Sequence, residues 1–420
     1  MKKIIFSGLL IISIIGNTNS QQLDISAELR PRYENKHGFG TLLATDADGS
    51  NFISQRTRLN FDFKQDNLIF KMSLQNVRVW GDVNTLSSDD TANALHEAWA
   101  EAVLNDKISL KLGRQEIAYD DQRIFGSVDW AQQARSHDAF LFKYVPNAKN
   151  RLDIGLALNS DSQSNLDNLY SNAAGYKAFQ YAWYHGDFDN LGLSVLLLNT
   201  GIEYLDNINE QTLDYMQTIG SRLTYKFDKF NVNGAAYFQT GKSFDNKVSA
   251  SYFTGNLSYK ISSDISLGLG YEYLSGKDQD DVDTDIKSFM PLFGTNHKFN
   301  GWMDYFYVGN HGGSVGLNDI SFTFSYQKDK FSAKLVPHLF SSVANIYDGS
   351  TKMDNNLGTE IDLTFGYKIS EDILLNAGYS KMLSTESMEI IKVGGDSDEN
   401  NSWAWVMITF KPQLFSTKQQ

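Results

Sequence analysis

Arginine is the residue whose type and spacing most clearly suggest a chemical task in this 420-residue chain. Eight of the ten arginines fall between Arg30 and Arg135, and some stand two residues apart, as Arg56 and Arg58 do. A guanidinium stays charged and offers a planar fork to carboxylates or phosphates, so this set predicts anion binding. The formal net charge of the whole chain is −13, which excludes nucleic acid as a partner.

Carboxylates lie close to these arginines in the sequence. The stretch from Gly113 to Gly126, GRQEIAYDDQRIFG, holds two of the arginines together with Glu116 and Asp121, and Asp138 follows. Two interpretations stay open. The arginines form a track that selects anionic solutes, or the opposite charges compensate one another and fill the interior as a rigid ladder.

The remaining polar residues predict no further chemistry. The segment KDQDDVDTD, residues 277–285, is rich in oxygen ligands but lacks the glutamate and glycine of a standard calcium loop, so a solvated loop is favoured and calcium binding stays open. His297, Asp304 and His311 stand seven residues apart, which fits no standard zinc arrangement. No serine occupies a G-x-S-x-G elbow. We therefore expect no catalytic residue, no metal and no cofactor.

The elements that carry the arginines alternate with a period of two. In residues 52–64, Leu59 and Phe61 share one face with other apolar side chains, whereas Arg56 and Arg58 share the opposite face. This alternation is typical of β-strands and recurs along most of the chain. By itself it also fits a soluble β-sandwich.

The lengths of the connections favour a membrane barrel over the sandwich. Connections after even-numbered strands are short and most of those after odd-numbered strands are long and polar, which is typical of an outer-membrane barrel with tight periplasmic turns and long extracellular loops. A Greek-key sandwich has no reason to keep this rhythm. Both chain ends then lie on the periplasmic side. We count about 18 strands, near 23–34, 52–65, 68–80, 95–105, 108–117, 134–145, 150–160, 177–187, 190–199, 214–227, 229–240, 250–261, 264–275, 315–328, 331–342, 357–369, 372–382 and 402–412.

A spanning sheet must close on itself, with its apolar face toward lipid and its other face toward the lumen. By this parity the inward-facing cations are Arg30, Arg32, Arg56, Arg58, Arg222 and Lys334. Strict parity would place Arg78 and Arg114 in lipid, which is costly. We therefore expect a bulge near residues 75–76 to turn Arg78 inward, and a bend at Gly113 to turn Arg114 and Glu116 inward.

The first twenty residues have the pattern of a secretory signal, with two lysines, an apolar run and small or polar residues. The run is about 12 residues long and a spanning helix needs about 20. We predict a signal peptide at 1–20, a barrel at 21–412 and a polar C-terminal tail at 413–420. An N-terminal anchor helix is the alternative for the first segment.

The stretch LGRQEIAYDDQRIFGSVDWAQQARSHDAF, residues 112–140, resembles the alginate export family of outer-membrane barrels. The stretches RPRYE at 30–34, QRTRL at 55–59 and GTNHKFNGWMDYFYVG at 294–309 are also similar to family members. Asp120 and His137 depart from the glycine and the aromatic residue that are more common there.

The resemblance implies an 18-stranded barrel in the outer membrane of a Gram-negative bacterium, with an arginine-rich constriction that passes an anionic polysaccharide outward. The selectivity candidates that it implies are Arg30, Arg32, Arg56, Arg58, Arg78, Arg114, Arg123 and Arg135, and the acids that position them are Glu116, Asp121 and Asp138. We expect the loop from Ala118 to Gln133 to bend into the lumen. A solvated extracellular loop is the alternative.

The sequence thus predicts a passive anion-selective channel and no enzyme. The expected partners are outer-membrane lipid and lipopolysaccharide, an anionic solute or polysaccharide, and a periplasmic export partner. Three alternatives remain open: an anion-leaning porin for small-molecule uptake, a barrel hydrolase, and a nonconducting scaffold. The solute, the direction of transport, gating and the oligomeric state stay open.

Overall fold

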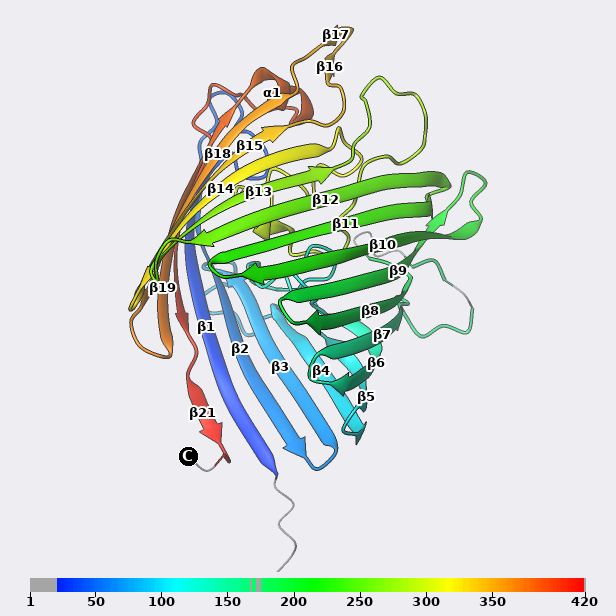
Figure 1. Cartoon of the computed structure of the whole chain (residues 1–420), viewed down its shortest axis with the longest axis vertical. Coiled ribbons are helices and arrows are strands. Elements are labelled where there is room, and N and C mark those ends of the chain that lie inside the picture. Colours follow the sequence, from blue (N-terminus) through cyan, green and yellow to red (C-terminus); the bar gives the residue numbers. More distant parts are fainter. Residues whose placement is uncertain (1–20, 167, 171–174, 419–420) are drawn as a thin grey trace, which may run out of the picture.

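A closed antiparallel β-barrel forms the body of the molecule (Figure 1). The computed structural model describes residues 21–166, 168–170 and 175–418, and the predicted signal peptide lies outside them. Within these residues, 18 strands pair in sequence order, and β1 pairs with both β2 and β20 so that no edge remains. The predicted fold is confirmed.

Each of the 18 predicted segments overlaps one barrel strand. The barrel strands are β1 (Gln22–His37), β2 (Ser50–Gln65), β3 (Leu68–Val79), β4 (Asn93–Asn105), β5 (Ile108–Gln115), β6 (His137–Asn147), β7 (Asn150–Leu158), β8 (Ala178–Phe188), β9 (Leu191–Leu205), β10 (Gln211–Phe227), β11 (Phe230–Ser243), β12 (Asn246–Lys260), β13 (Ile265–Leu274), β14 (Leu317–Lys328), β15 (Phe331–Ser341), β18 (Asn356–Lys368), β19 (Ile373–Ser384) and β20 (Ser402–Phe410).

Several smaller elements were not expected from the sequence. They are the hairpin of β16 (Tyr347–Asp348) and β17 (Thr351–Lys352), the 3-10 turn η1 (Asn296–Lys298), the helix α1 (Glu386–Ile391) and β21 (Gln413–Ser416). Strand β21 pairs with the start of β1, so part of the predicted polar tail extends the sheet. Neither helix reaches the length and apolarity of a membrane span in the described residues.

The short turns owe their tightness to aspartate. Asp66, Asp189, Asp228 and Asp329 each occupy the first position of a two-residue turn, with φ between 46° and 54°. Aspartate tolerates this left-handed conformation because its short polar side chain can bond locally. The two ends of the described chain lie at this same end of the barrel (Figure 1).

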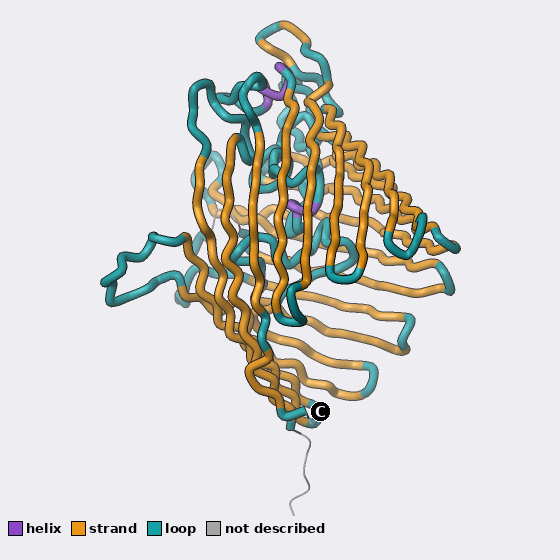
Figure 2. The backbone as a smooth tube through the Cα atoms, turned by 90° about the vertical axis from the view of Figure 1, so that its left-hand side faces the viewer, coloured by secondary structure: helices purple, strands orange, loops and turns teal. Residues whose placement is uncertain are grey.

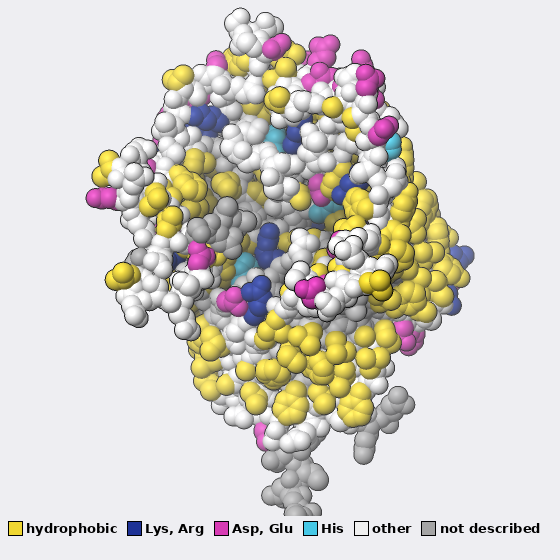
Figure 3. All heavy atoms as spheres, turned by 180° about the vertical axis from the view of Figure 1, so that it is seen from behind, with side chains coloured by type: hydrophobic (Ala, Val, Ile, Leu, Met, Phe, Trp, Pro, Cys, Tyr) yellow, Lys and Arg dark blue, Asp and Glu magenta, His cyan; other side chains and the backbone are white. Residues whose placement is uncertain are grey.

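The outer face of the wall is apolar. In β13 and β14, Leu267 lies opposite Phe324 and Leu269 opposite Phe322, and these four side chains are 42–48% exposed. Figure 3 shows such side chains as yellow bands on the outer surface, with charged side chains in the central hollow. A water-soluble protein rarely exposes so large an apolar area, whereas lipid accepts it.

Two long connections fold into the barrel (Figure 2). We name residues 116–136, between β5 and β6, loop A, and residues 275–316, between β13 and β14, loop B. Phe125 of loop A and Phe289, Met303 and Phe306 of loop B are at most 1% exposed, so part of the apolar core lies inside the lumen. The predicted inward course of residues 118–133 is confirmed.

Candidate functional site: a lumen narrowed by two docked loops

Four arginines of β1 and β2 form what we name the arginine wall: Arg30, Arg32, Arg56 and Arg58. Arg30 lies directly opposite Arg56 in the strand register, and all four side chains are at most 9% exposed. Their predicted inward direction is confirmed. Because buried guanidinium groups need partners, their contacts decide what this wall can do.

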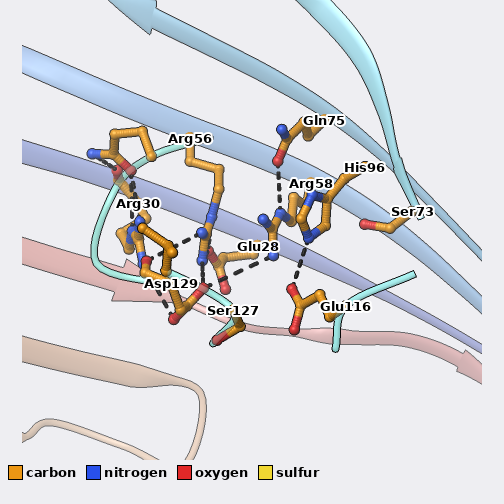
Figure 4. A network of polar contacts seen from close by, with 12 residues as sticks. Glu28, Arg30, Arg56, Arg58, Ser73, Gln75, His96, Glu116, Ser127 and Asp129 are labelled. Carbon is orange, nitrogen blue, oxygen red and sulfur yellow. Dashed lines mark hydrogen bonds and ion pairs between the residues drawn. The ribbon is translucent and has the colours of Figure 1, made fainter. Parts of the chain in front are cut away.

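Backbone carbonyls of loop A are the first set of partners. The Nη1 group of Arg30 donates to the carbonyl of Asp129 at 2.9 Å, and its Nε donates to the side chain of Gln132 at 3.1 Å. Arg32 donates to the carbonyl of Trp130 at 2.8 Å and lies 4.2 Å from the centre of its ring. The two arginines therefore hold residues 129–132 of loop A against the wall, and Figure 4 shows Arg30 beside Asp129.

Carboxylates are the second set. The Arg56 Nη2 atom lies 2.5 Å from Glu28 and 2.9 Å from Asp129, which is part of loop A. Burial raises the pKa of Asp129, but Arg56 and then Arg30 outweigh burial, so this pKa lies below its usual value. Asp129 stays charged at neutral pH and fastens the loop to the wall.

Arg58 is bonded less completely than its neighbours. Its Nε donates to Gln75 at 2.9 Å, and the amide of Gln75 donates in turn to the carbonyl of Gln133 at 3.0 Å. Its Nη2 is buried and has no hydrogen-bond partner in the described part of the chain. Most of the bonded guanidinium nitrogens of the arginine wall therefore donate to loop A. This agrees with the interpretation in which the arginines are compensated by other protein groups.

Loops A and B are joined inside the barrel. The amide of Gly126 donates to Phe293 at 2.8 Å, the amide of Thr295 donates to Gln122 at 2.9 Å, and Phe125 and Phe293 form a parallel bridge. A β-carbon at Gly126 would lie 2.3 Å from Thr295 Oγ1. This close approach explains why a glycine is needed at this position.

Arg123 connects both loops with the far wall. It is 1% exposed, and its Nη2 lies 3.2 Å from Glu272 of β13 and 2.8 Å from the side chain of Asn300 in loop B. Asp121, predicted to position arginines of its own segment, makes its ion pair with Arg222 of β10, which faces inward as predicted. Both arginines therefore bind protein groups.

Two predicted pore residues lie on the outer face, which corrects the expectation. The β2–β3 register is unbroken from Leu68 to Val79, so no bulge turns Arg78 inward. Arg114 lies opposite Asp138, outside the lumen, although Gly113 has a φ of 122°. Arg78 pairs with Asp90, and Arg114 with Asp138 at 2.9 Å.

The physical reason for the correction is pairing. Each of these two arginines stands within two residues of the end of its strand, and a carboxylate neutralises it there. The cost of an unpaired charge in lipid, on which the prediction rested, therefore does not arise. The bulge exists in the neighbouring strand β4, opposite the step from Ser73 to Leu74.

The remaining predicted residues are held inside. Arg135 donates to the carbonyl of Gly294 at 3.1 Å and so joins loop A to loop B. Glu116 lies inside as expected, but its partner is His96 at 2.7 Å and not an arginine. The sequence indicated neither contact, because the partners are 159 and 20 residues away.

The open part of the lumen is lined by lysine. A cavity of about 530 Å³ lies between the two loops and the wall of β15 to β20, and Lys298, Lys334 and Trp302 line it. The same three residues line a neighbouring cavity of about 200 Å³, together with the carboxylates of Asp121, Glu272 and Asp319. Both lysines are exposed, and no described carboxylate lies within ion-pair distance of either. The inward direction of Lys334 is confirmed.

Lys298 is a lumen cation that the sequence analysis missed. It lies at the end of η1 in loop B and donates to the carbonyl of Asp121 at 3.1 Å. The alternation along strands makes no prediction for Lys298, because this residue does not lie in a strand. The similarity of residues 294–309 to family members was the available signal.

The wall of β11 to β14 differs from the arginine wall. We name its small uncharged side chains the neutral wall: Asn233, Asn256, Ser258, Ser321, Thr323 and Ser325. They line a further cavity of about 270 Å³, together with Lys334. Their hydroxyl and amide groups can donate and accept hydrogen bonds, so this face can replace the hydration of a polar solute.

The two departures from the family pattern have partners of their own. Asp120 accepts a hydrogen bond from the indole of Trp183 at 3.0 Å. The Nδ1 atom of His137 lies 2.8 Å from the hydroxyl of Tyr176. Both residues anchor loop A and its end to β8 and to the segment before it.

Comparison with known proteins agrees with this architecture. The family model described as alginate export matches residues 21–403. Among solved structures, OccAB4 of Acinetobacter baumannii has a TM-score of 0.65 at 12% identity, covering 95% of this chain and 100% of that one. OccK3 (OpdO) of Pseudomonas aeruginosa has a TM-score of 0.62 at 14% identity, covering 94% and 96%.

The structure of Pseudomonas aeruginosa OpdK with vanillate has a TM-score of 0.60 at 12% identity, covering 94% of this chain and 98% of that one. No curated protein matches the sequence. At these identities the solved structures show a shared barrel fold, and the family match covers nearly the whole barrel. The chain belongs to the alginate export family and forms an outer-membrane β-barrel channel of a Gram-negative bacterium.

Proposed function

We propose that this channel passes anionic solutes and that an anionic polysaccharide moving outward is its main cargo. The observation that carries the proposal is the pair of exposed lysines, Lys298 and Lys334, which line both neighbouring cavities. A cation in a narrow, low-dielectric passage attracts anions more strongly than one on an open surface. The membership in the alginate export family supports a polysaccharide as the anion.

In this proposal the inner arginines act through the protein groups that they hold. Those of the arginine wall, together with Arg123 and Arg135, hold the loops that narrow the lumen, and Arg222 holds Asp121. Arg78 and Arg114 take no part in selection, because they lie on the outer face.

The neutral wall supports a hydroxylated cargo. Its serine, threonine and asparagine side chains offer donors and acceptors without the strong binding of a paired charge. A sugar chain that exchanges water for such groups can move from one to the next. This feature favours a polysaccharide over an apolar solute.

Uptake of small organic anions is the second candidate. It is supported by the shared barrel fold of the Occ channels, one of which has been solved with vanillate. The two candidates require the same lysines but differ in the size of the solute. Outer-membrane lipid and lipopolysaccharide surround the barrel in both, and a periplasmic partner on the short turns belongs to the export candidate.

Planar-bilayer recording tests the anion preference. We expect the wild-type protein to conduct with an anion-favouring reversal potential in a salt gradient. The double change Lys298→Ser with Lys334→Ser should move that potential toward the cation side, and Arg114→Ser is the matched control, since it removes a cation from the outer face. Equal reversal potentials in all three proteins would contradict the proposal.

The same recordings separate the remaining alternatives. Charged oligosaccharides of uronic acid should interrupt the current, whereas vanillate should do so under the small-anion candidate. Absence of current with hydrolysis of lipid or polysaccharide would indicate a barrel enzyme. Absence of both would indicate a nonconducting scaffold.

A further inference from the structure

A bulge in β4 places two neighbouring side chains on the same side of the wall. Successive residues of a regular strand face opposite sides, yet His96 and Glu97 are 4% and 6% exposed and both lie inside. The register shift opposite Ser73 accommodates the extra residue. Glu116, the first residue of loop A, follows the adjacent strand β5 and points toward His96 (Figure 4).

These three residues offer one imidazole nitrogen and two carboxylates at short range. Their ligand atoms all lie within 4.8 Å of one another. None of the three residues lines the two cavities that Lys298 and Lys334 line, and Figure 4 shows His96 and Glu116 beside Arg58 of the arginine wall. Lys71 lies 2.8 Å from Glu97 Oε2, and the indole of Trp99 donates to Glu97 Oε1 at 2.9 Å.

The hydrogen bonds around His96 point to a cation. The hydroxyl of Ser136 lies 2.6 Å from the His96 carbonyl and must donate its single proton there. The Nδ1 atom, 3.1 Å from the same hydroxyl, must then donate to it. In a neutral imidazole this leaves Nε2 with a lone pair, and Nε2 lies 2.7 Å from a carboxylate oxygen of Glu116. Two acceptors at that distance need a shared cation. A proton fits the separation of 2.7 Å as it stands, and a metal ion fits once Glu116 moves outward by about 0.6 Å, since two ligand atoms of a tetrahedral zinc ion lie roughly 3.3 Å apart.

We propose that His96, Glu97 and Glu116 bind a divalent transition-metal ion of the zinc class. Imidazole and carboxylate together suit zinc and its neighbours, whereas calcium and magnesium prefer oxygen ligands alone. Ser136 fixes the ring through its Nδ1 side, as the outer partner of a metal-binding histidine usually does. Lys71 keeps its contact with the second oxygen of Glu97.

In this proposal the ion joins the start of loop A to the barrel wall. Glu116 begins the loop, whereas His96 and Glu97 belong to the wall, so a shared ion joins the two. The arginine wall holds the other end of the same loop at Asp129 and Trp130. With both ends held, the constriction keeps one width during conduction.

Titration calorimetry with zinc chloride on the detergent-solubilised mature chain tests this site. We expect one saturable zinc ion per chain. His96→Ala and the isosteric change Glu116→Gln should each weaken binding by at least about tenfold. His185→Ala is the matched control, because His185 also faces a carboxylate, at 3.4 Å from Asp187, but belongs to no three-ligand group in the described residues.

Heat-modified electrophoretic mobility confirms that each variant remains a folded barrel. Zinc should raise the melting temperature of the wild-type protein and of His185→Ala, but not that of Glu116→Gln. Absence of saturable zinc uptake by the wild type, or wild-type affinity in both site variants, overturns the proposal and leaves a proton as the shared cation. Neither result tests the anion preference, which the proposed function assigns to Lys298 and Lys334.

Discussion

The arginine wall and the neutral wall are inner faces of one continuous sheet, yet they meet different surroundings. Loop A covers the arginine wall, and its carbonyls and Asp129 occupy the guanidinium groups. The neutral wall borders an open cavity that Lys334 also lines, and Arg222 donates to its Asn233 at 2.8 Å. A part of the sequence rich in arginine is therefore among the least exposed parts of the lumen.

The difference follows from the cost of burying charge. A guanidinium out of water needs hydrogen bonds and a counter-charge, so it attracts a loop that supplies both. Small neutral side chains need no counter-charge, and water can satisfy their hydrogen bonds. Arginines in a barrel wall thus bind a loop, and the bound loop narrows the passage. Cations without protein partners stay accessible to the solute.

The largest effect should come from Arg56→Ala. The change leaves Glu28 buried and loop A without its main ionic fastener, and removing one partner of a buried pair costs about 3–5 kcal/mol. We expect loop A to leave the wall, with a higher and noisier single-channel conductance and faster proteolysis within residues 116–136. Arg114→Ala on the outer face is the control, and unchanged conductance in Arg56→Ala would refute the fastening role.

A second large effect should follow from Gly126→Val. The new β-carbon would lie 2.3 Å from Thr295 Oγ1, so loops A and B must separate at their bridge. We expect faster amide exchange in both loops and a moderate rise in conductance. Gly312→Val is the control, because nothing lies within 4 Å of its built β-carbon. Equal amide exchange in the two variants would contradict the role of this bridge in holding loops A and B together.

Acid should weaken the docking of loop A through Asp129. Its pKa is lowered in the folded protein, so its contribution to docking is fully present above the usual value of 3.8 and is lost as the pH falls through the lowered value. We expect current noise to rise below that range in the wild type. Asp129→Asn should be noisy already at neutral pH and lack the acid step; a step of the same size in both would assign it to another group.

The smallest effect should come from the neutral wall. Thr323→Val keeps the shape and removes one hydroxyl from the cavity lining. We expect conductance to stay within about twofold, since such changes are worth roughly 0.5 kcal/mol, and blocking events by hydroxylated anions to shorten slightly. If Thr323→Val had an effect as large as that of Lys334→Ser, the neutral wall would matter as much for the solute as the lysines do, which contradicts the roles proposed for them.

Local pattern was enough to predict the wall. The period of two placed Arg30, Arg56, Arg222 and Lys334 on the inner face, and the tight aspartate turns set the strand order. The prediction that Arg78 and Arg114 turn inward was wrong, because it assumed that a charge on the outer face stays unpaired. Their carboxylate partners come from a loop and from a neighbouring strand, which the pattern does not connect to them.

Along the regular parts of the strands, the sequence by itself determined which side chains face lipid and which face the lumen, because that alternation is a property of the extended backbone. Only the tertiary structure decided which lumen charges remain exposed. Arg30 meets loop A across 99 residues and Lys298 meets Asp121 across 177 residues. Contacts at such separations depend on how the closed barrel folds its two loops inward, and no local repeat encodes them.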